Sequence, residues 1–440
     1  MLLEKSLRDI RVVLDPEEFP KDWYNLVPDL HRPLPPPMDP WDGPSKLELL
    51  PKIFMKEALR QEFTAQRFVQ IPEELKELYV SVLGRPTPLC RARRLEQYLK
   101  TPAKIYFKRE DLTPTGSHKP NTAIAQAFFA KKEGLDYLAT ETGAGQWGSA
   151  LAFATSVVGL GCLVYMVRTS YMSKPYRRIL MELYGAKVFP SPSDRTDFGK
   201  KLIAEYPDNP GSLGIAISEA IETTLNDVGK AAYAIGSTLN HVLLHQSIIG
   251  IEAMKQFKLI DTNPDIMIGC AGGGSNFAGF TFPAIGRQLE KGGNIRFIAV
   301  GASEVPKWTK GQYRYDFPDS GSLTPMLKMH TVGHEYIPPP IYSGGLRYHG
   351  YSPILSLLVK DGIVEGKEYT QEQAFQAAKT FALTEGIITA PETAHAIAAV
   401  IDEAVECKRR GERKVIAFNH SGHGHFDLQG YNDVLLNKSP

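Results

Sequence analysis

Short apolar runs rich in β-branched residues alternate along this chain with longer segments in which apolar residues recur at helical spacing. The helical spacing is clear at residues 174–184 and 372–385, where charged side chains occupy the opposite face. Such alternation predicts an α/β fold with mostly parallel sheets flanked by helices. The predicted strands are residues 104–108, 137–140, 162–168, 186–189, 265–270, 295–301 and 415–418.

Two segments depart from this alternation. The first eighty residues are irregular and rich in proline, above all at residues 31–40, HRPLPPPMDP, which predicts an extended polyproline-like arm or a linker. Residues 142–167 contain no charged side chain and would be long enough to span a bilayer. Because Gly159 and Gly161 divide this stretch and Gln146 and Thr155 make it more polar, we expect a buried helix, a turn and a strand instead.

The composition narrows the class of protein. At 440 residues the chain can form one large or two interlocked domains with a deep site. Lys and Arg number 50 against 49 Asp and Glu, a balance that provides no general attraction for nucleic acid or anionic lipid. The four cysteines are far apart and form no CxxC pair, which favours free thiols in a reducing cytoplasm. Because MLLEKSLRDI also lacks the features of a signal peptide, we expect a cytoplasmic protein that binds neither nucleic acid nor membrane.

The strongest local pattern is a strand that runs directly into a glycine-rich loop, DIMIGC followed by AGGGSNFAG. Consecutive glycines let the backbone approach a phosphate, and the start of the following helix supplies partial positive charge. Ser275 and Asn276 can add side-chain donors. A dinucleotide fingerprint is a second interpretation, although Phe277 occupies the position of its third glycine, and an ordinary tight turn is a third.

Three further motifs carry candidate chemistry, each with a less specific alternative. Lys119, in SHKPN, precedes an Ala-rich helical pattern and is either a reactive amine or a solvated lysine at a helix end. ETGAGQWG, from Glu141, places glycines and a hydroxyl between a strand and a helix, which suits a bound carboxylate but is also common in turns. HSGHGHF, from His420, brings three histidines together, but their spacing matches no standard zinc site, so we expect no metal.

Taken together, these motifs resemble the tryptophan synthase β chain in their order and spacing. The resemblance spans roughly residues 84–430 and includes EGIITAPET from Glu385, while the long N-terminal segment and the SGHGH ending are similar to the second type of β chain. It implies the two-domain pyridoxal-phosphate fold of type II, shared with serine and threonine dehydratases. It also implies an N-terminal domain (an arm, residues 1–81, plus residues 119–240) and a C-terminal cofactor-binding domain (residues 82–118 and 241–440), with the active site between them.

The resemblance implies a role for each motif in the conversion of L-serine and indole to L-tryptophan with pyridoxal 5'-phosphate. Lys119 would carry the cofactor and move the Cα proton, because burial makes an amine more easily neutral. Ser421 would hydrogen-bond the pyridine nitrogen, Glu392 would lie near the ring, and Glu141 would assist loss of the β-substituent and orient indole. The other implied ligands are Gly272, Gly273, Gly274, Ser275 and Asn276 for the phosphate, with His118 adjacent, and Thr142, Gly143, Ala144, Gly145 and Gln146 for the substrate carboxylate.

Two positions depart from the family pattern. Trp147 stands where the main type has a histidine, and Arg347 stands where it has an aspartate that holds the serine hydroxyl. A guanidinium beside the leaving group favours an anionic one, so O-phospho-L-serine becomes a candidate donor and Arg347 a candidate substrate ligand. The alternative is that Arg347 points away and pairs with an acid. Because the C-terminal motif is altered, a homodimer is the first expectation, and an α chain is left open as a further partner.

Three other functions compete with this interpretation. A serine or threonine dehydratase would share the first half of the reaction, but its pattern does not ordinarily place a glutamate where Glu141 stands. A non-catalytic scaffold is disfavoured because Lys119, Glu141 and Ser421 are all present. A nicotinamide-dependent oxidoreductase rests on the imperfect glycine pattern alone and leaves Lys119 unexplained.

Overall fold

Two sheets covered by helices form the framework of the computed structural model, which describes residues 7 and 9–436. The strands are β1 (Arg11–Val12), β2 (Asp22–Tyr24), β3 (Phe68–Gln70), β4 (Leu89–Arg91), β5 (Lys104–Arg109), β6 (Tyr137–Thr142), β7 (Gly161–Val167), β8 (Lys187–Ser191), β9 (Ala231–Tyr233), β10 (Ile266–Cys270), β11 (Arg296–Ala302), β12 (Gln312–Asp316), β13 (Leu327–Thr331), β14 (Val364–Tyr369) and β15 (Val415–His420). The smaller sheet, in the order β8-β7-β6-β9, is parallel throughout. The larger has the order β1-β4-β5-β15-β10-β11-β14 and is parallel from β5 onward. The predicted α/β class is confirmed.

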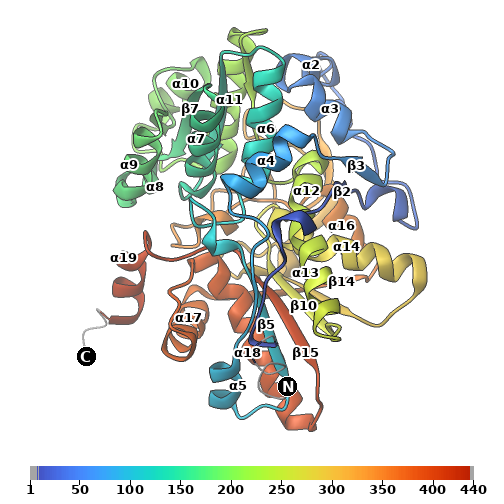
Figure 1. Ribbon diagram of the computed structural model, residues 1–440. Helices are drawn as coiled ribbons and strands as arrows, with labels where there is room; N and C mark the ends of the chain where they lie inside the picture. The colour runs from blue at the N-terminus through green and yellow to red at the C-terminus, as the bar shows by residue number, and fades with distance from the viewer. Residues whose placement is uncertain (1–6, 8, 437–440) are drawn as a thin grey trace.

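The helices lie on both sides of these sheets. They are α2 (Leu50–Ile53), α3 (Lys56–Glu62), α4 (Glu73–Ser81), α5 (Arg93–Leu99), α6 (Pro120–Lys132), α7 (Gln146–Val158), α8 (Arg168–Ser173), α9 (Pro175–Leu183), α10 (Asp197–Glu205), α11 (Leu213–Asn226), α12 (Asn240–Gln246), α13 (Ile248–Leu259), α14 (Ser275–Lys291), α15 (Lys307–Lys310), α16 (Pro353–Lys360), α17 (Gln371–Glu385), α18 (Pro391–Arg410) and α19 (Leu428–Tyr431). In Figure 1 the smaller sheet and α6 to α11 occupy the upper part of the molecule, and β5, β10 and β15 lie with α18 below.

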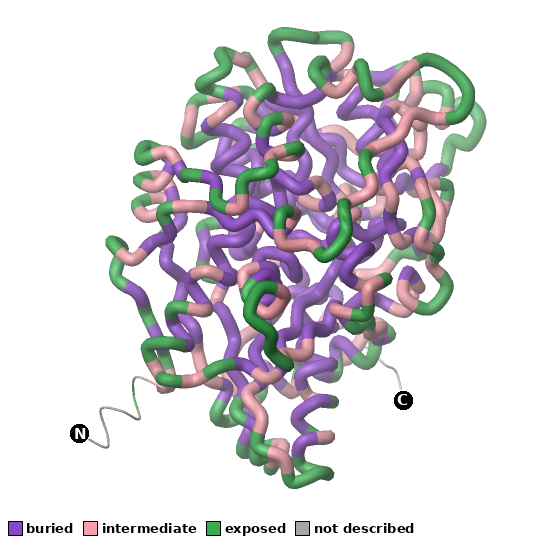
Figure 2. Tube along the Cα trace, turned by 90° about the vertical axis from the view of Figure 1, so that its right-hand side faces the viewer, coloured by how far each residue is buried: buried purple, intermediate pink, exposed green. Residues whose placement is uncertain are grey.

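Alternation along the strands of the larger sheet creates a core on each of its faces. Met267 of β10 packs in the cluster that contains Phe277 and Phe280 of α14. Its neighbours Ile266 and Ile268 pack instead in the cluster built on α18. Because successive side chains of a strand point to opposite faces, β10 is apolar throughout and buried on both sides. Figure 2 shows this continuous buried interior, with the exposed positions confined to outer loops and helix faces.

The predicted strands and helices are confirmed, with boundaries that shift by one or two residues. All seven predicted strands appear, as β5, β6, β7, β8, β10, β11 and β15, and the two predicted helices are α9 and α17. Residues 142–167 form the expected buried helix, turn and strand, in which Gly159 ends α7 in the left-handed conformation with φ of 71°. Across the described ranges, no helix combines the length and apolar character needed to cross a membrane.

The expectation of an extended N-terminal arm is wrong for most of its length. Residues 22–81 contain β2, β3 and three helices, and Trp23, Leu75 and Tyr79 are fully buried in the main core cluster. Trp23 packs on His245 of α12 with ring centroids 4.6 Å apart. The proline-rich stretch at residues 31–40 does lack helix and strand, apart from a bridge between Met38 and Met326. Large buried apolar side chains on either side of the prolines therefore stabilise a packed segment, although the prolines themselves favour an extended chain.

The domain boundaries after residues 81, 118 and 240 stay a prediction. The expectation that MLLEKSLRDI is not a signal peptide concerns residues 1–10, and residues 1–6 lie outside the described residues.

Candidate active site

One cavity lies at the carboxyl ends of strands from both sheets. In the smaller sheet β6 ends at Thr142, and in the larger sheet β10 ends at Cys270. Ligand sites in parallel α/β folds form at such ends, because loops there can vary without disturbing the sheet. The sequence-predicted residues that line the cavity are His118, Lys119, Glu141, Thr142, Gly143, Ala144, Gln146, Gly272, Gly273, Gly274, Ser275, Asn276, Glu392 and Ser421.

Lys119 directly precedes Pro120, the first residue of α6, and its side chain lines the cavity. Its Nζ donates a long hydrogen bond, 3.5 Å, to the carbonyl oxygen of Gly236. Burial lowers the pKa of Lys119, against the opposing effect of Glu141 and Glu392. More of this amine is therefore neutral than for a solvated lysine, and the neutral form can attack a carbonyl carbon or accept a proton.

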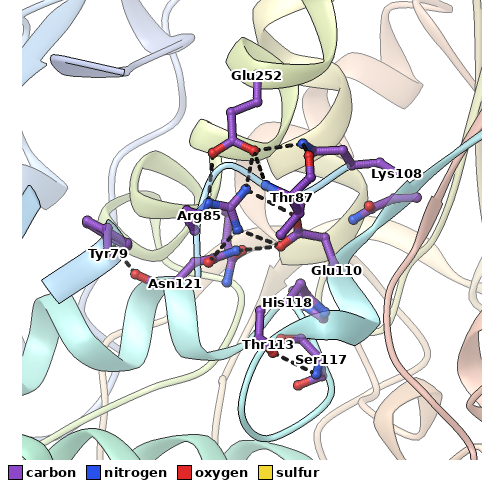
Figure 3. Close-up of polar contacts among 12 residues, drawn as sticks. Tyr79, Arg85, Thr87, Lys108, Glu110, Thr113, Ser117, His118, Asn121 and Glu252 are labelled. Carbon is purple, nitrogen blue, oxygen red and sulfur yellow. Dashed lines mark hydrogen bonds and ion pairs between the residues drawn. The ribbon is translucent and has the colours of Figure 1, made fainter. Parts of the chain in front are cut away.

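A cluster of fully buried charges lies next to the first turn of α6 (Figure 3). Arg85 donates hydrogen bonds to Glu110 at 2.9 and 3.1 Å and to Glu252 at 2.9 and 2.8 Å. Lys108 donates to Glu252 at 2.7 Å, and all four side chains are 0 % exposed. Two positive and two negative groups thus compensate one another, which is the condition for tolerating charges away from water.

Asn121 joins this charge cluster to the lysine. Its side chain accepts from Arg85 at 2.8 Å and donates to Glu110 at 2.9 Å, and its backbone oxygen accepts from Tyr79 at 2.6 Å. Asn121 is two residues beyond Lys119, in the first turn of α6. The cluster therefore anchors the first turn of α6, next to which the Lys119 side chain extends into the cavity.

The glycine loop (Gly272, Gly273, Gly274, Ser275 and Asn276) connects β10 to α14. Gly274 has φ of +115°, and a Cβ at Gly273 would lie 2.3 Å from Ser237 Oγ, so larger residues do not fit at either position. No side chain in the described part of the chain caps the start of α14, and its amide groups remain available to a ligand. Ser237 Oγ is buried without a hydrogen-bond partner among the described residues, and Ser237 also lines the cavity. These groups fit a phosphate.

Ser421 follows β15 and lies among neutral polar groups. Its Oγ is 2.6 Å from the hydroxyl of Thr393 on α18 and 3.5 Å from Cys270 Sγ. Burial raises the pKa of Cys270 to about 12 and lowers the pKa of His118 to about 3, so both are uncharged near neutral pH. The His118 ring contacts the backbone oxygen of Ser421 at 3.3 Å and Ser275 Oγ at 3.4 Å. Such surroundings suit a hydrogen bond from Ser421 to an unprotonated ring nitrogen.

Glu141 lies near the end of β6, 5 % exposed. Tyr233 of β9 donates a short hydrogen bond to its carboxylate. Burial raises the pKa of Glu141 to about 7, with the Tyr233 hydrogen bond acting in the opposite direction. Both protonation states are populated near neutral pH, as a group that transfers protons requires.

Glu392, the second residue of α18, links two loops that line the cavity. It accepts a hydrogen bond from the amide of Gly345 at 2.8 Å and from the side chain of Gln146 at 2.9 Å. Ala144 packs on Gly344 from the other side, where a Cβ would lie 2.6 Å away. Glu392 and the Ala144–Gly344 contact therefore hold residues 142–146 and 344–346 together beside the cavity.

Two predicted residues do not line this cavity as it is described. Gly145 caps α7 with φ of +94° and packs against Arg177. Arg347 lines a neighbouring cavity that also includes Lys174 and Ser170. Its guanidinium donates to the backbone oxygen of Pro338 at 2.8 Å, and in the described part of the chain no acidic side chain pairs with it.

Sequence reasoning missed several residues that line the cavity, and three of them are consecutive. Gly236, Ser237 and Thr238 follow β9 and line the cavity beside the glycine loop, where Ser275 Oγ donates to the backbone oxygen of Gly236 at 3.2 Å. The available signal was a short apolar strand, AAY, followed two residues later by GST, a pattern too brief to separate from an ordinary turn. Trp147, noted as a departure, also lines the cavity and donates to Thr140 at 2.6 Å.

A second, strongly apolar cavity adjoins the first. Ile217, Ile235 and Thr238 line both cavities, and Phe54 and Tyr233 are among the other residues that line the second. Neighbouring space of this kind suits a flat aromatic molecule better than a charged one.

The three histidines of HSGHGHF do not converge. His420 Nδ1 lies 3.1 Å from Asp111, whereas the rings of His423 and His425 stack on each other 4.7 Å apart. Within the described ranges, no group of three or more His, Cys, Asp or Glu side chains is arranged to hold a metal ion.

Comparisons with known proteins place this geometry in a family. The family described as pyridoxal-phosphate dependent enzyme matches residues 80–422. The chain is 57% identical over 417 residues to a tryptophan synthase beta chain 1 of Sulfurisphaera tokodaii, covering 94% of this chain and 97% of that one. It is also 57% identical over 431 residues to a tryptophan synthase beta chain 2 of Aeropyrum pernix, with 98% and 96% covered.

Solved structures with much lower identity share the fold. A processed threonine deaminase isoform 2 from Solanum lycopersicum superposes with a TM-score of 0.58 at 17% identity, covering 83% of this chain and 93% of that one. A fungal L-serine ammonia-lyase from Rhizomucor miehei gives 0.57 at 15%, with 80% and 97% covered. These likenesses confirm the predicted type II fold. The chain therefore belongs to the pyridoxal-phosphate-dependent enzymes and, within them, to the tryptophan synthase beta chains.

Proposed function

We propose that this enzyme joins indole to the three-carbon fragment of L-serine to make L-tryptophan, with Lys119 carrying pyridoxal phosphate. The observation that carries the proposal is Glu141, a buried carboxyl with a pKa raised to about 7 in the same cavity as Lys119. The adjoining apolar cavity offers indole a dry place beside it. The bound cofactor supplies an electron sink that makes the substrate Cα acidic and its β-substituent a leaving group.

The cofactor phosphate would be held by the glycine loop, the open start of α14 and the Ser237 hydroxyl, with neutral His118 adjacent. The Ser421 hydroxyl would donate to the pyridine nitrogen, which stays unprotonated. Thr393, 2.6 Å from Ser421 Oγ, would hold that hydroxyl in place. A ring nitrogen paired with a hydroxyl restrains the electron sink, which favours replacement at Cβ over transamination.

Each acid and base then has a position suited to its step. Lys119, with its lowered pKa, would remove and later return the Cα proton. The amide groups at the start of α7, together with Thr142 and Gln146, would bind the substrate carboxylate, and Glu392 would orient Gln146. Glu141 would protonate the departing hydroxyl and, once ionised, accept the indole N–H so that C3 faces Cβ.

The deciding experiment follows absorbance and product together. Purified protein is mixed with pyridoxal phosphate, then with L-serine and indole, and Lys119→Ala serves as the control. A visible band of lysine-bound cofactor and tryptophan formation that both require Lys119 would support the proposal. Pyruvate in place of tryptophan would overturn it in favour of a dehydratase, and absence of the band would overturn the assignment of Lys119.

The preferred donor is a separate proposal that concerns Arg347. Its buried guanidinium donates to the backbone oxygen of Pro338, and Arg347 directly follows Gly344, Gly345 and Leu346, which line the reaction cavity. Within the described ranges the charge has no acidic partner, so an anionic leaving group would be attracted to it, and O-phospho-L-serine is the candidate. Initial rates with O-phospho-L-serine and with L-serine test this proposal. Equal rates, or faster turnover of L-serine, would overturn it.

We also propose a cytoplasmic homodimer. All four cysteines are free thiols, as a reducing compartment allows. Light scattering of the purified chain, alone and mixed with a tryptophan synthase α chain, would separate a homodimer from a mixed complex.

A further inference from the structure

Lys307 is a buried lysine that the reaction described above does not use. It is the first residue of the short helix α15, which follows β11, and it is 0 % exposed. Its ammonium group donates to the backbone oxygen of Gly272 at 2.8 Å and to the backbone oxygen of Tyr348 at 2.8 Å. The same nitrogen lies 4.2 Å from the centre of the Tyr351 ring.

The surroundings of this ammonium are those of a small desolvated cation. Two carbonyl oxygens and one aromatic face surround it, and in the described part of the chain no carboxylate lies within ion-pair distance of its nitrogen. Burial lowers the pKa of Lys307 to about 7, and Glu368 acts in the opposite direction. The oxygens of Glu368 accept from the Trp308 amide and the Thr309 hydroxyl. Carbonyl dipoles and an aromatic ring are groups that bind monovalent cations.

The two carbonyls belong to the two segments that form one side of the reaction cavity. Gly272 begins the glycine loop, and Tyr348 lies in the segment 344–352 that carries Gly345. The segments also touch directly, because the amide of Ser352 donates to the backbone oxygen of Gly273 at 2.8 Å. A Cβ at Gly272 would lie 2.0 Å from the backbone oxygen of Gly345. Lys307 therefore adds side-chain hydrogen bonds to both segments, beside the backbone contacts that the glycine loop and segment 344–352 make with each other.

Holding one carbonyl also orients an amide. The C=O and N–H of a trans peptide point in opposite directions, so an ammonium that fixes the Gly272 carbonyl turns the Gly273 N–H away from itself. Gly272 and Gly273 both line the cavity. The positive charge further polarises this peptide and makes its N–H a stronger donor.

We propose that Lys307 is a positioning residue that acts as a built-in monovalent cation, joining the glycine loop to segment 344–352 and presetting the loop for the cofactor phosphate. The inference rests on the proposed role of the glycine loop as the phosphate site. A cation supplied by the chain itself cannot dissociate, so below pH 7, where the ammonium form of Lys307 prevails, the enzyme should bind its cofactor equally well in sodium, potassium or tetraalkylammonium salts.

The test removes the cation and offers a replacement. Lys307→Ala leaves two carbonyls and a space, and Lys310→Met, on the exposed side of α15, is the matched control. We expect Lys307→Ala to bind pyridoxal phosphate roughly ten- to a hundredfold more weakly, the loss typical of removing a group that orients a binding site. Ammonium or potassium chloride should restore much of that affinity, whereas choline chloride at the same ionic strength, with a cation too large for the space, should not.

A second readout needs neither cofactor nor substrates. The unfolding temperature of the full-length apoprotein should rise with ammonium or potassium, relative to choline, for Lys307→Ala but not for wild type or Lys310→Met. If Lys307→Ala does not fold, Lys307→Gln, which keeps a donor and loses the charge, takes its place. The proposal is overturned if the variant binds the cofactor like wild type, or if choline restores binding as well as potassium does. A wild type that binds the cofactor but makes no tryptophan would instead overturn the proposed function and leave this inference standing.

Discussion

Two buried sets of charges a few residues apart behave in opposite ways. In the cluster of Arg85, Lys108, Glu110 and Glu252, each charge has an opposite partner at hydrogen-bond distance. Burial alone would raise the pKa of Glu110, but Arg85, Lys108 and Thr87 together outweigh it and lower this pKa to about 2. In the reaction cavity burial prevails, lowering the pKa of Lys119 and raising the pKa of Glu141 to about 7.

The difference shows that pairing decides what a buried charge does. A paired charge stays ionised across the physiological range and serves as an anchor. A poorly paired charge moves toward neutrality and becomes able to exchange protons. Asn121 lies between the two sets, so the anchor positions the reactive group without neutralising it.

Lys119→Ala should produce the largest change, because it removes both the cofactor attachment and the base. Tryptophan formation should fall about 10⁴-fold, the upper range for a general acid–base group. The unfolding midpoint in urea should change little, since Lys119 takes no part in the charge cluster. Lys132→Ala, at the exposed end of the same helix, should keep full activity. An active Lys119→Ala enzyme would mean that another amine carries the cofactor.

Glu110→Ala should break the anchor. Removing one partner leaves Arg85 buried with unpaired donors, at a cost of about 3–5 kcal/mol in the free energy of unfolding measured in urea. Glu73→Ala, which removes an exposed ion pair with Lys76, should cost less than about 1 kcal/mol. Equal effects of the two substitutions would show that burial of the pair carries no special weight.

The anchor also predicts a pH dependence of stability. The pKa of Glu110 is lower in the folded state than its ordinary value of 4.5. Its contribution is therefore fully present above pH 4.5 and is lost as the pH falls toward about 2. Glu110→Gln should flatten the stability curve in that window.

Glu141→Gln should separate chemistry from folding. We expect tryptophan formation to fall about 100-fold while cofactor binding is retained. In the wild type, indole addition should rise through pH 7, because the carboxyl must be ionised to accept the indole N–H, and by about tenfold between pH 6 and pH 8. A variant whose rate keeps the same pH profile would assign the ionisation to another group.

Asn121→Ala should have the smallest effect and tests the connection between the two regions. Losing its bonds to Arg85 and Glu110 should destabilise the protein by about 1–3 kcal/mol. If the cluster positions Lys119, kcat should also fall, by roughly tenfold, with little change in the KM for serine. A purely structural role would lower stability alone.

Much of the framework could be predicted from local sequence. Seven strands were visible as apolar runs, because β10 and its neighbours are buried on both faces and contain few polar positions. The glycine loop was visible because close approach to Ser237 and a φ of +115° at Gly274 leave no room for a side chain. Lys119, Glu141 and Ser421 were found through the order of several motifs, since each alone has a common alternative.

Other features depend on residues far apart in the chain. Arg85 and Glu252 are separated by 167 positions, and nothing local to either indicates that they pair. The N-terminal segment packs because its aromatic residues meet α6 and α12, which its own proline content cannot reveal. Arg347 was assigned beside the leaving group from its place in a motif, yet it lines a neighbouring cavity.

The sequence by itself determined the periodic elements, the positions that must be glycine and the order of the motifs, because these follow from the stereochemistry and burial of adjacent residues. Only the tertiary structure decided which charges are paired, which pKa values shift, and that Lys307 lies between two carbonyls of the cavity wall. The physical reason is that desolvation and Coulomb interactions depend on distance in space, and the fold brings together groups from many parts of the chain.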